Sequence, residues 1–156
     1  CATFKRSVDA RASTQCFGRA AELAKAELIE RAGHARTLRE RLEAGIASLP
    51  GLRIFAAGAE RLPNTLQFGI GGLDGEWLVM ELDKRGIAVS SGSACHSGSG
   101  KPSHVLTAMG LDEATAKAAL RVSCGAGNTP EDVDALCAAL KEIVATLGKR
   151  VAAVGW

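Results

Sequence analysis

The sequence predicts an α+β domain in which a small antiparallel or mixed sheet packs against helices, the first of them a long N-terminal helix. Three observations support this class: a long helical apolar pattern near the amino end, short apolar runs of period 2 farther along, and a second helical pattern near the carboxyl end. With 156 residues, 47% hydrophobic and 23% charged, the chain has the length and composition of one globular domain. We therefore expect helices and strands layered around a single core.

The first predicted element is an amphipathic helix over residues 16–48. The segment is rich in Ala, Leu, Glu, Lys and Arg, which favour helices. Its apolar side chains fall near one face of a 3.6-residue period, at Leu28, Ala35, Leu38, Leu42, Ile46 and Leu49. A bend is expected at Gly33 or Gly45, and the pair Pro50 and Gly51 ends the helix.

Four short strands are predicted from apolar runs. Residues 52–55 form the first, and residues 65–70 alternate apolar with polar or small side chains as a strand with one buried face does. Residues 87–89 and 119–123 supply the third and fourth apolar runs. Each run is bounded by turn or helix signals, so we expect the strands to form one small sheet.

Three helices are predicted between and after these strands. Asp74 is a good N-cap for a helix that Gly86 ends, and a short helix lies between residues 102 and 110. The last helix begins at Thr129 with a cap, a proline and an acidic first turn together. Its predicted buried stripe consists of Val133, Leu136, Leu140, Val144 and Leu147.

Several cysteines and large side chains are expected in the core. Cys137 lies in a helical apolar pattern and Cys124 ends an apolar strand, both settings typical of small buried hydrophobes. Trp77, Met80 and Met109 occupy helical apolar positions as well. The five cysteines have no CxxC pair and no paired spacing, so we expect reduced thiols rather than a disulfide framework.

The most informative segment for chemistry is residues 90–100, in which eight of eleven residues are Ser or Gly around Cys95. Gly and Ser favour a flexible segment, and a polar, exposed setting lets a thiol ionise more readily than burial does. We therefore predict that Cys95 is a nucleophile carried on a mobile segment. The alternative is that residues 90–100 are a Ser/Gly linker without a function. His96 follows directly, and its imidazole would ease thiolate formation, so it is a candidate modulator.

A metal site is not expected. His96 and His104 flank the loop and, with Cys95 and Cys124, offer ligand atoms. Structural zinc sites favour tight Cys or His pairs, and adjacent Cys and His side chains have poor geometry for binding one ion. These residues are therefore interpreted without a metal.

The composition argues against nucleic-acid and membrane binding. The formal net charge is +2 at pH 7, there is no Tyr, and Lys and Arg form no dense cluster, whereas nucleic-acid sites combine basic clusters with aromatic side chains. No apolar run approaches the roughly 20 residues that span a bilayer, and the amino end lacks the pattern of a signal peptide. We expect a cytoplasmic protein.

Several motifs together resemble the C-terminal small domain of cysteine desulfurases. These are pyridoxal-phosphate enzymes of fold type I in the class V aminotransferase superfamily, and they supply sulfur for iron–sulfur clusters. The resemblance spans residues 17–147, and the long Ser/Gly-rich loop is similar to the group with a mobile catalytic cysteine. The motifs are Ser90–Cys95, Pro102–Leu106, Met109–Leu111 and Leu120–Ser123, with Asn64 and the helix start Asp74–Glu76 upstream.

The resemblance implies roles for two residues. Cys95 would take the sulfur of L-cysteine as a persulfide and leave alanine, and Arg121 would bind the substrate carboxylate. Strand alternation is compatible with this, because Arg121 points away from Leu120 and Val122 and its guanidinium suits a bidentate pair. From the residues alone, a solvated strand face is the alternative. Asn64, His96 and His104 are further candidate modulators.

The resemblance also implies a part that this chain does not supply. The family holds pyridoxal phosphate on a lysine that follows a histidine in a large domain ahead of this region, and none of the seven lysines here follows a histidine. We expect residues 1–15 to be an atypical or disordered lead segment, residues 16–150 to be the domain, and residues 151–156 to be a tail. The absence of an initiator methionine indicates an excised or truncated piece.

The expected partners are a pyridoxal-phosphate large domain or subunit, a sulfur acceptor or scaffold protein, and a second copy in a homodimer. The chain is expected to be inactive alone. Two alternatives remain open: a stand-alone sulfur-relay or partner-binding module without pyridoxal phosphate, and a non-functional fragment whose exposed apolar face invites self-association.

Overall fold

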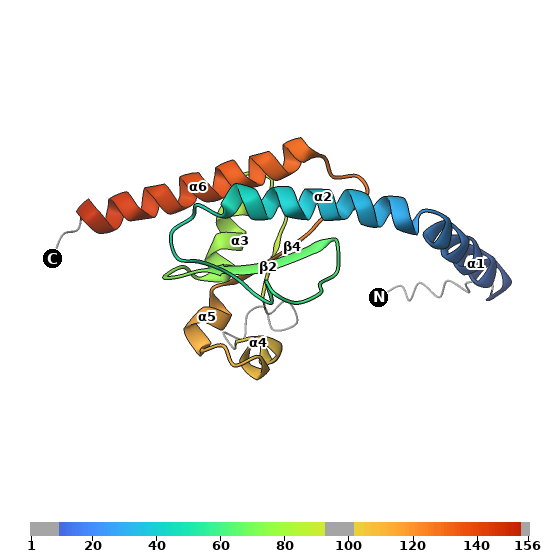
Figure 1. Ribbon diagram of the computed structural model, residues 1–156, viewed down its shortest axis with the longest axis horizontal. Helices are drawn as coiled ribbons and strands as arrows, with labels where there is room; N and C mark the ends of the chain where they lie inside the picture. The colour runs from blue at the N-terminus through green and yellow to red at the C-terminus, as the bar shows by residue number, and fades with distance from the viewer. Residues whose placement is uncertain (1–9, 93–101, 154–156) are drawn as a thin grey trace, which may run out of the picture.

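The computed structural model describes residues 10–92 and 102–153 of the chain. Helices and strands alternate along it, as the sequence predicts (Figure 1). Their bounds are α1 Ala10–Ala26, α2 Leu28–Ile46, β1 Leu52–Ile54, β2 Thr65–Ile70, α3 Gly75–Asp83, β3 Ser90–Ser91, α4 His104–Ala108, α5 Glu113–Lys117, β4 Ala119–Ser123 and α6 Pro130–Ala153.

The four strands form one antiparallel sheet in the order β1-β2-β4-β3. Apolar residues alternate along β2 and β4, so one face of the sheet is buried. This confirms the predicted α+β class and decides between the antiparallel and mixed alternatives.

Helices α2, α3 and α6 cover the buried face, whereas α4 and α5 lie on the other side of the sheet (Figure 1). The main core joins α2, α3 and α6 to the apolar sides of β2 and β4. A smaller cluster on the other side joins Phe55, Leu106, Ala116 and Ala119. The small cluster therefore covers only one end of the second face.

The long N-terminal helix is interrupted, but the predicted place of the bend was wrong. The break lies at Glu27, where φ −98° and ψ 1° depart from helical values. Backbone hydrogen bonds still run through this position, from Glu27 N–H to the Leu23 carbonyl at 3.0 Å and from Arg31 N–H to the Glu27 carbonyl at 2.9 Å. The axis therefore changes direction between α1 and α2 without a loop (Figure 1).

Gly45 has a packing role instead of a bending role. A Cβ atom built on Gly45 would lie under 3.0 Å from Cys137 Sγ, closer than real Cβ atoms come to a neighbour. The missing side chain thus lets α2 and α6 approach each other over the sheet. Cys137 and Cys124 are both buried, as predicted.

The third strand begins later than predicted, because residues 87–89 pair with no strand and pairing starts at Ser90. Gly86, at φ +74°, turns the chain at the end of α3, and Ile87 and Val89 then pack partly against the core. These apolar side chains mimic a strand pattern although the segment only connects α3 to the edge of the sheet.

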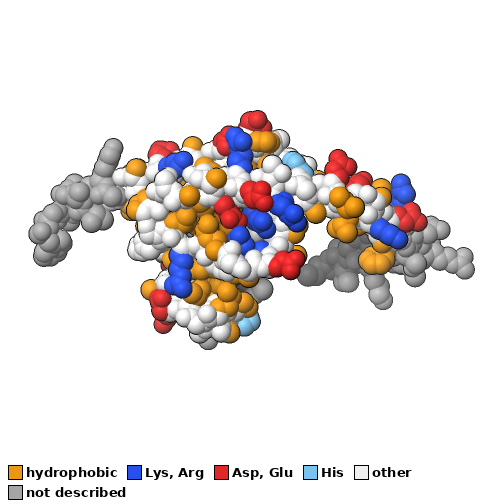
Figure 2. All heavy atoms as spheres, viewed as in Figure 1, with side chains coloured by type: hydrophobic (Ala, Val, Ile, Leu, Met, Phe, Trp, Pro, Cys, Tyr) orange, Lys and Arg blue, Asp and Glu red, His pale blue; other side chains and the backbone are white. Residues whose placement is uncertain are grey.

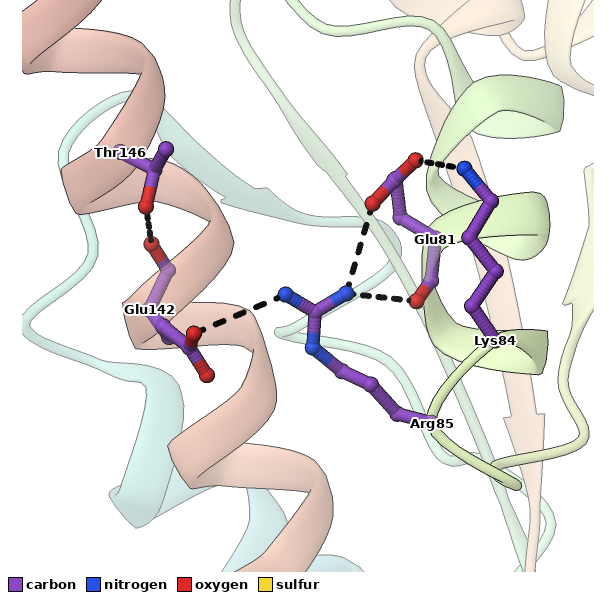
Figure 3. A network of polar contacts seen from close by, with 5 residues as sticks. All are labelled: Glu81, Lys84, Arg85, Glu142 and Thr146. Atoms are coloured by element: carbon purple, nitrogen blue, oxygen red, sulfur yellow. Dashed lines mark hydrogen bonds and ion pairs between the residues drawn. The ribbon is translucent and has the colours of Figure 1, made fainter.

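An ion-pair network holds the end of α3 against α6 (Figure 3). Arg85 Nη1 donates to the Glu81 carbonyl oxygen at 2.8 Å, and Arg85 Nη2 lies 3.7 Å from Glu142 Oε1. Lys84 Nζ donates to Glu81 Oε1 at 2.6 Å. The turn at Gly86 is therefore tied to both helices.

The predicted starts of α3 and α6 are confirmed, whereas the first helix begins at Ala10, six residues before the predicted start at Cys16. Asp74 accepts from the backbone N–H groups of Glu76 at 2.9 Å and Trp77 at 3.0 Å. Thr129 and Asp132 cap α6 reciprocally. Thr129 N–H donates to Asp132 Oδ2 at 3.0 Å, and Asp132 N–H donates to Thr129 Oγ1 at 3.4 Å.

Helix α5 was not predicted, although its cap was visible in the sequence. Asp112 accepts from Thr115 N–H at 2.9 Å and from Thr115 Oγ1 at 2.7 Å.

The expected burial of two methionines was wrong, since Met80 is 56% and Met109 is 51% exposed, whereas Trp77 packs partly against the core. Within residues 10–92 and 102–153, no helix has the length and apolar character that crossing a bilayer requires.

Candidate functional site

Arg121 lies on the face of the sheet opposite the main core, which we call the outer face. Along β4, Leu120 and Val122 are buried while Arg121 and Ser123 are exposed. This is the alternation that the sequence predicts for a strand with one face on the core. The Arg121 guanidinium is therefore directed away from the main core.

A polar row crosses the outer face at Arg121. Gln67 of β2 and Ser90 of β3 are its direct partners in the sheet register. Directly paired residues of an antiparallel sheet share a face, so all three side chains project on the same side. The next row along is also polar, with Thr65 Oγ1 and Ser123 Oγ 3.4 Å apart.

The cysteine loop leaves the sheet beside this row. Gly92 N–H donates to the Ala119 carbonyl at 2.8 Å, which extends the β3–β4 pairing to the start of the loop. A Cβ atom on Gly92 would lie under 3.0 Å from Ala119 Cβ and 3.4 Å from Leu106 Cδ1. Leu106 belongs to α4, which follows the loop, and it packs in the same small cluster as Ala119. Gly92 before the loop and α4 after it therefore both lie beside Ala119 of β4.

Cys95 and His96 lie outside the described residues. Of the other predicted site residues, His104 is exposed and begins α4, just after the loop. Asn64 lies at the opposite end of β4, where its backbone carbonyl accepts from Cys124 N–H at 2.8 Å and its Oδ1 accepts from Thr65 Oγ1 at 3.3 Å. The fold thus brings Arg121 and the ends of the loop together but leaves Asn64 apart from the loop ends.

The two buried thiols are poorly suited to nucleophilic chemistry. Burial raises the pKa of Cys124 and of Cys137, because the thiolate is disfavoured where water is excluded. In both cases desolvation is the largest cause. Neither residue therefore offers a ready alternative nucleophile.

Four lysines whose side chains are described, Lys25, Lys84, Lys117 and Lys141, do not fit the attachment of pyridoxal phosphate. A lysine that forms a Schiff base must reach its neutral form, which burial or a cationic neighbour favours. Lys84 and Lys117 are instead exposed and paired with Glu81 and Glu113, and the carboxylate of Glu113 raises the pKa of Lys117. Lys25 and Lys141 are exposed on helices.

The described residues also offer no metal centre. Residues 10–92 and 102–153 contain no group of three or more His, Cys, Asp and Glu side chains placed to hold a metal ion.

On the face drawn in Figure 2, Lys and Arg are interspersed with Asp and Glu instead of forming separate positive and negative patches. This charge distribution suits a small charged ligand better than a polyanion.

Reasoning from the sequence missed Gln67 and Gly92. Gln67 lies beside Arg121 and Gly92 bonds to Ala119 only because of how the strands pair. That register is set by the folded sheet and cannot be read from one strand alone. The only signal in the sequence was the position of Gln67 among the polar residues of an alternating strand.

Known proteins resemble this chain in sequence. The family model described as Aminotransferase class-V matches residues 11–136. Cysteine desulfurase IscS of Clostridium botulinum is 42% identical over 131 residues, which are 82% of this chain and 33% of that protein. A cysteine desulfurase of Cereibacter sphaeroides is 44% identical over 129 residues, covering 82% of this chain and 33% of the relative. The chain thus spans about a third of the length of these relatives.

Solved structures agree as well. A NifS-like protein from Rickettsia africae superposes with a TM-score of 0.72 at 33% identity, covering 81% of this chain and 32% of that one. Another structure described as a NifS-like protein gives a TM-score of 0.70 at 36% identity, over 82% of this chain and 32% of its own. The fold, the matched family model and these relatives agree, and the chain therefore belongs to the class-V aminotransferase family.

Proposed function

We propose that this chain is the C-terminal portion of a cysteine desulfurase, in which Cys95 accepts sulfur from L-cysteine and Arg121 binds the substrate carboxylate. The pairing of Ser90 with Arg121 carries the proposal. Because the loop begins just after Ser90 and Gly92, a carboxylate bound at Arg121 would lie near the base of the loop that carries Cys95. The identity with cysteine desulfurases over 82% of the chain supports the same assignment.

The reaction assigns one bond-making step to this chain. The Cys95 thiolate attacks the sulfur of L-cysteine, so that an S–S bond forms while the C–S bond of the substrate breaks. The electron pair of the broken bond stays on the substrate carbon, which then takes up a proton to give alanine. The product on the protein is a persulfide that an acceptor can remove. Arg121 contributes by holding the substrate carboxylate in a bidentate pair.

Catalysis requires groups beyond these residues. In enzymes of this class, pyridoxal phosphate supplies an electron sink for the substrate carbon. Lys25, Lys84, Lys117 and Lys141 do not fit its attachment, and the chain spans about a third of its relatives. We therefore assign the cofactor to a large domain or subunit, and propose a sulfur acceptor or scaffold protein and a second copy of the chain as further partners.

A chimera tests the assigned roles. Residues 17–147 of this chain would replace the matching third of the Clostridium botulinum relative, and alanine and protein-bound persulfide would be measured with L-cysteine. We expect turnover that Cys95→Ser abolishes. Arg121→Ala should raise the KM about ten- to hundredfold, because a charged hydrogen-bonded pair is lost. Persulfide and alanine at normal levels in Cys95→Ser would overturn the assignment of the nucleophile.

The isolated chain tests whether turnover depends on a separate pyridoxal-phosphate domain or subunit. Incubated with pyridoxal phosphate and L-cysteine, it should develop no Schiff-base absorbance and release no alanine. A stable chromophore with turnover would contradict the proposal. If a separate persulfide donor loads Cys95 equally well in wild type and Arg121→Ala, a sulfur-relay module becomes the better assignment, since a relay needs no carboxylate site.

A further inference from the structure

Arg121 has two direct neighbours on the outer face, and they differ in hydrogen-bonding capacity. The Ser90 hydroxyl already donates to the Ser91 carbonyl at 3.2 Å. Within residues 10–92 and 102–153, neither the Gln67 amide nor the Arg121 guanidinium has a side-chain hydrogen-bond or ion-pair partner. Gln67 is therefore the neighbour that can still act on a ligand of Arg121.

The backbone pattern brings these two side chains close together. Phe55 N–H donates to the Gln67 carbonyl at 2.9 Å, so the backbone polar groups of Gln67 point toward β1 and away from β4. On the other side, Gly92 N–H bonds the Ala119 carbonyl, so alternate residues of β4, Arg121 included, direct their backbone groups toward β3. Gln67 and Arg121 thus form a non-hydrogen-bonded pair, the kind in which facing side chains lie closest, with Cβ atoms about 4.5–5.5 Å apart.

We propose that Gln67 is a second carboxylate-binding residue that works together with Arg121. Its amide oxygen can accept from the guanidinium, while its NH2 group donates to a carboxylate oxygen that Arg121 also holds. The ligand class is a small monocarboxylate, and that it is the carboxylate of an α-amino acid rests on the proposed function. A neutral amide suits this place, because an acidic side chain there would itself pair with Arg121.

The surroundings of the pair favour a small ligand. Among the described residues, no carboxylate lies within ion-pair distance of Arg121. The small cluster with Phe55 covers the Gly69 and Ala119 end of the outer face, and a Cβ atom on Gly69 would lie 3.2 Å from Phe55 Cζ. The polar row therefore borders an apolar wall on one side and the polar Thr65 and Ser123 on the other.

Titration of the isotopically labelled chain with sodium propionate, followed by NMR, tests the proposal without turnover. We expect the side-chain NH2 signals of Gln67 and the Nε–H signal of Arg121 to shift along one binding curve, and propionamide to shift neither. Gln67→Ala should weaken binding about tenfold or more through loss of one hydrogen bond to a charged group. Gln67→Glu should reduce it to the level of Arg121→Gln. Arg53→Gln, which removes a charge from the same face at β1, is the matched control and should change affinity less than twofold.

The outcomes separate this inference from the proposed function. If the Arg121 signal saturates while the Gln67 signals stay unmoved, or if Gln67→Ala binds as wild type does, the role of Gln67 is overturned and that of Arg121 stands. The wild-type titration decides this even if a variant fails to fold. If propionate moves neither signal, this inference is overturned, whereas alanine formation by the chimera still decides the proposed function on its own.

Discussion

Gly92 is the residue at which the β3–β4 pairing gives way to the cysteine loop. Its backbone N–H is fixed on Ala119, and there is no room above its Cα for a side chain. The constraint is steric, since Gly92 is not among the residues with positive φ. A glycine in a Ser/Gly-rich stretch can thus be a packing residue, which composition alone does not reveal.

Gly92→Ala should therefore destabilise the fold by about 1–3 kcal/mol, the usual cost of forcing an extra methyl group into a packed site. The new Cβ must displace either β4 or Leu106. Urea unfolding measures the change. Gly58→Ala is the matched control, because nothing lies within 4 Å of a Cβ atom at that position. Equal stability of the two variants would contradict the packing role of Gly92.

Among the elements, caps and apolar periodicity could be predicted far better than pairing. The N-caps at Asp74 and Thr129 and the strands β2 and β4 are readable because each depends on neighbouring residues. Residues 87–89 were assigned wrongly because an apolar segment that connects a helix to a sheet edge has the pattern of a short strand. The helix break at Glu27 carries no glycine or proline signal.

The crossing of α2 and α6 gives a prediction for helix packing. Gly45→Ala should destabilise the chain by about 1–3 kcal/mol, because its Cβ would collide with the Cys137 thiol. In a Cys137→Ala background the added cost should fall, since Sγ is the nearer of the two Cys137 atoms. Gly33→Ala, in the same helix but with open space around it, should instead stabilise by about 0.5–1 kcal/mol. Unfolding of wild type, Gly45→Ala, Cys137→Ala and the double variant forms a double-mutant cycle, and additive costs would exclude the collision.

The cap of α5 gives a prediction for pH. Hydrogen bonds from the Thr115 hydroxyl and backbone lower the pKa of Asp112 from its ordinary value of 3.8. A carboxylate with a lowered folded-state pKa contributes stability that is present above the unfolded pKa and is lost as the pH falls through the folded one. Asp112→Asn retains a capping oxygen, so its urea midpoint should fall less than that of wild type between pH 6 and about pH 2. An equal fall in both proteins would show that this cap does not titrate as described.

For the whole molecule, the layered α+β fold was predictable and the site only in part. Arg121 could be assigned to an outward-facing position because strand alternation is local. Its pairing with Gln67 and Ser90 could not, because a shift of one residue in register would have exchanged both neighbours. The role of Cys95 stays a prediction, since it lies outside the described residues.

The exposed apolar side chains of α1 and α2 predict self-association. Phe17 is 77%, Leu28 63% and Ile29 89% exposed, and Figure 2 shows apolar side chains gathered on α1. Sedimentation of the chain should reveal concentration-dependent dimers or larger species that Ile29→Lys reduces. Val105→Lys adds the same charge at a residue of α4 that is 54% exposed and should have no such effect. A sharp monomer at high concentration would count against this surface.

The two anchors of the cysteine loop, at Gly92 and Leu106, have a consequence for how the loop can vary. Gly92 N–H donates to the Ala119 carbonyl of β4, and Leu106 of α4 packs in the same cluster as Ala119, so the separation of these two anchors is set by the domain. Doubling the length of a flexible segment between fixed ends costs only about 0.6 kcal/mol of closure entropy. We therefore expect insertions or deletions between residues 93 and 101 to change the stability of the domain little, so that the length of this segment can vary without a change in the fold.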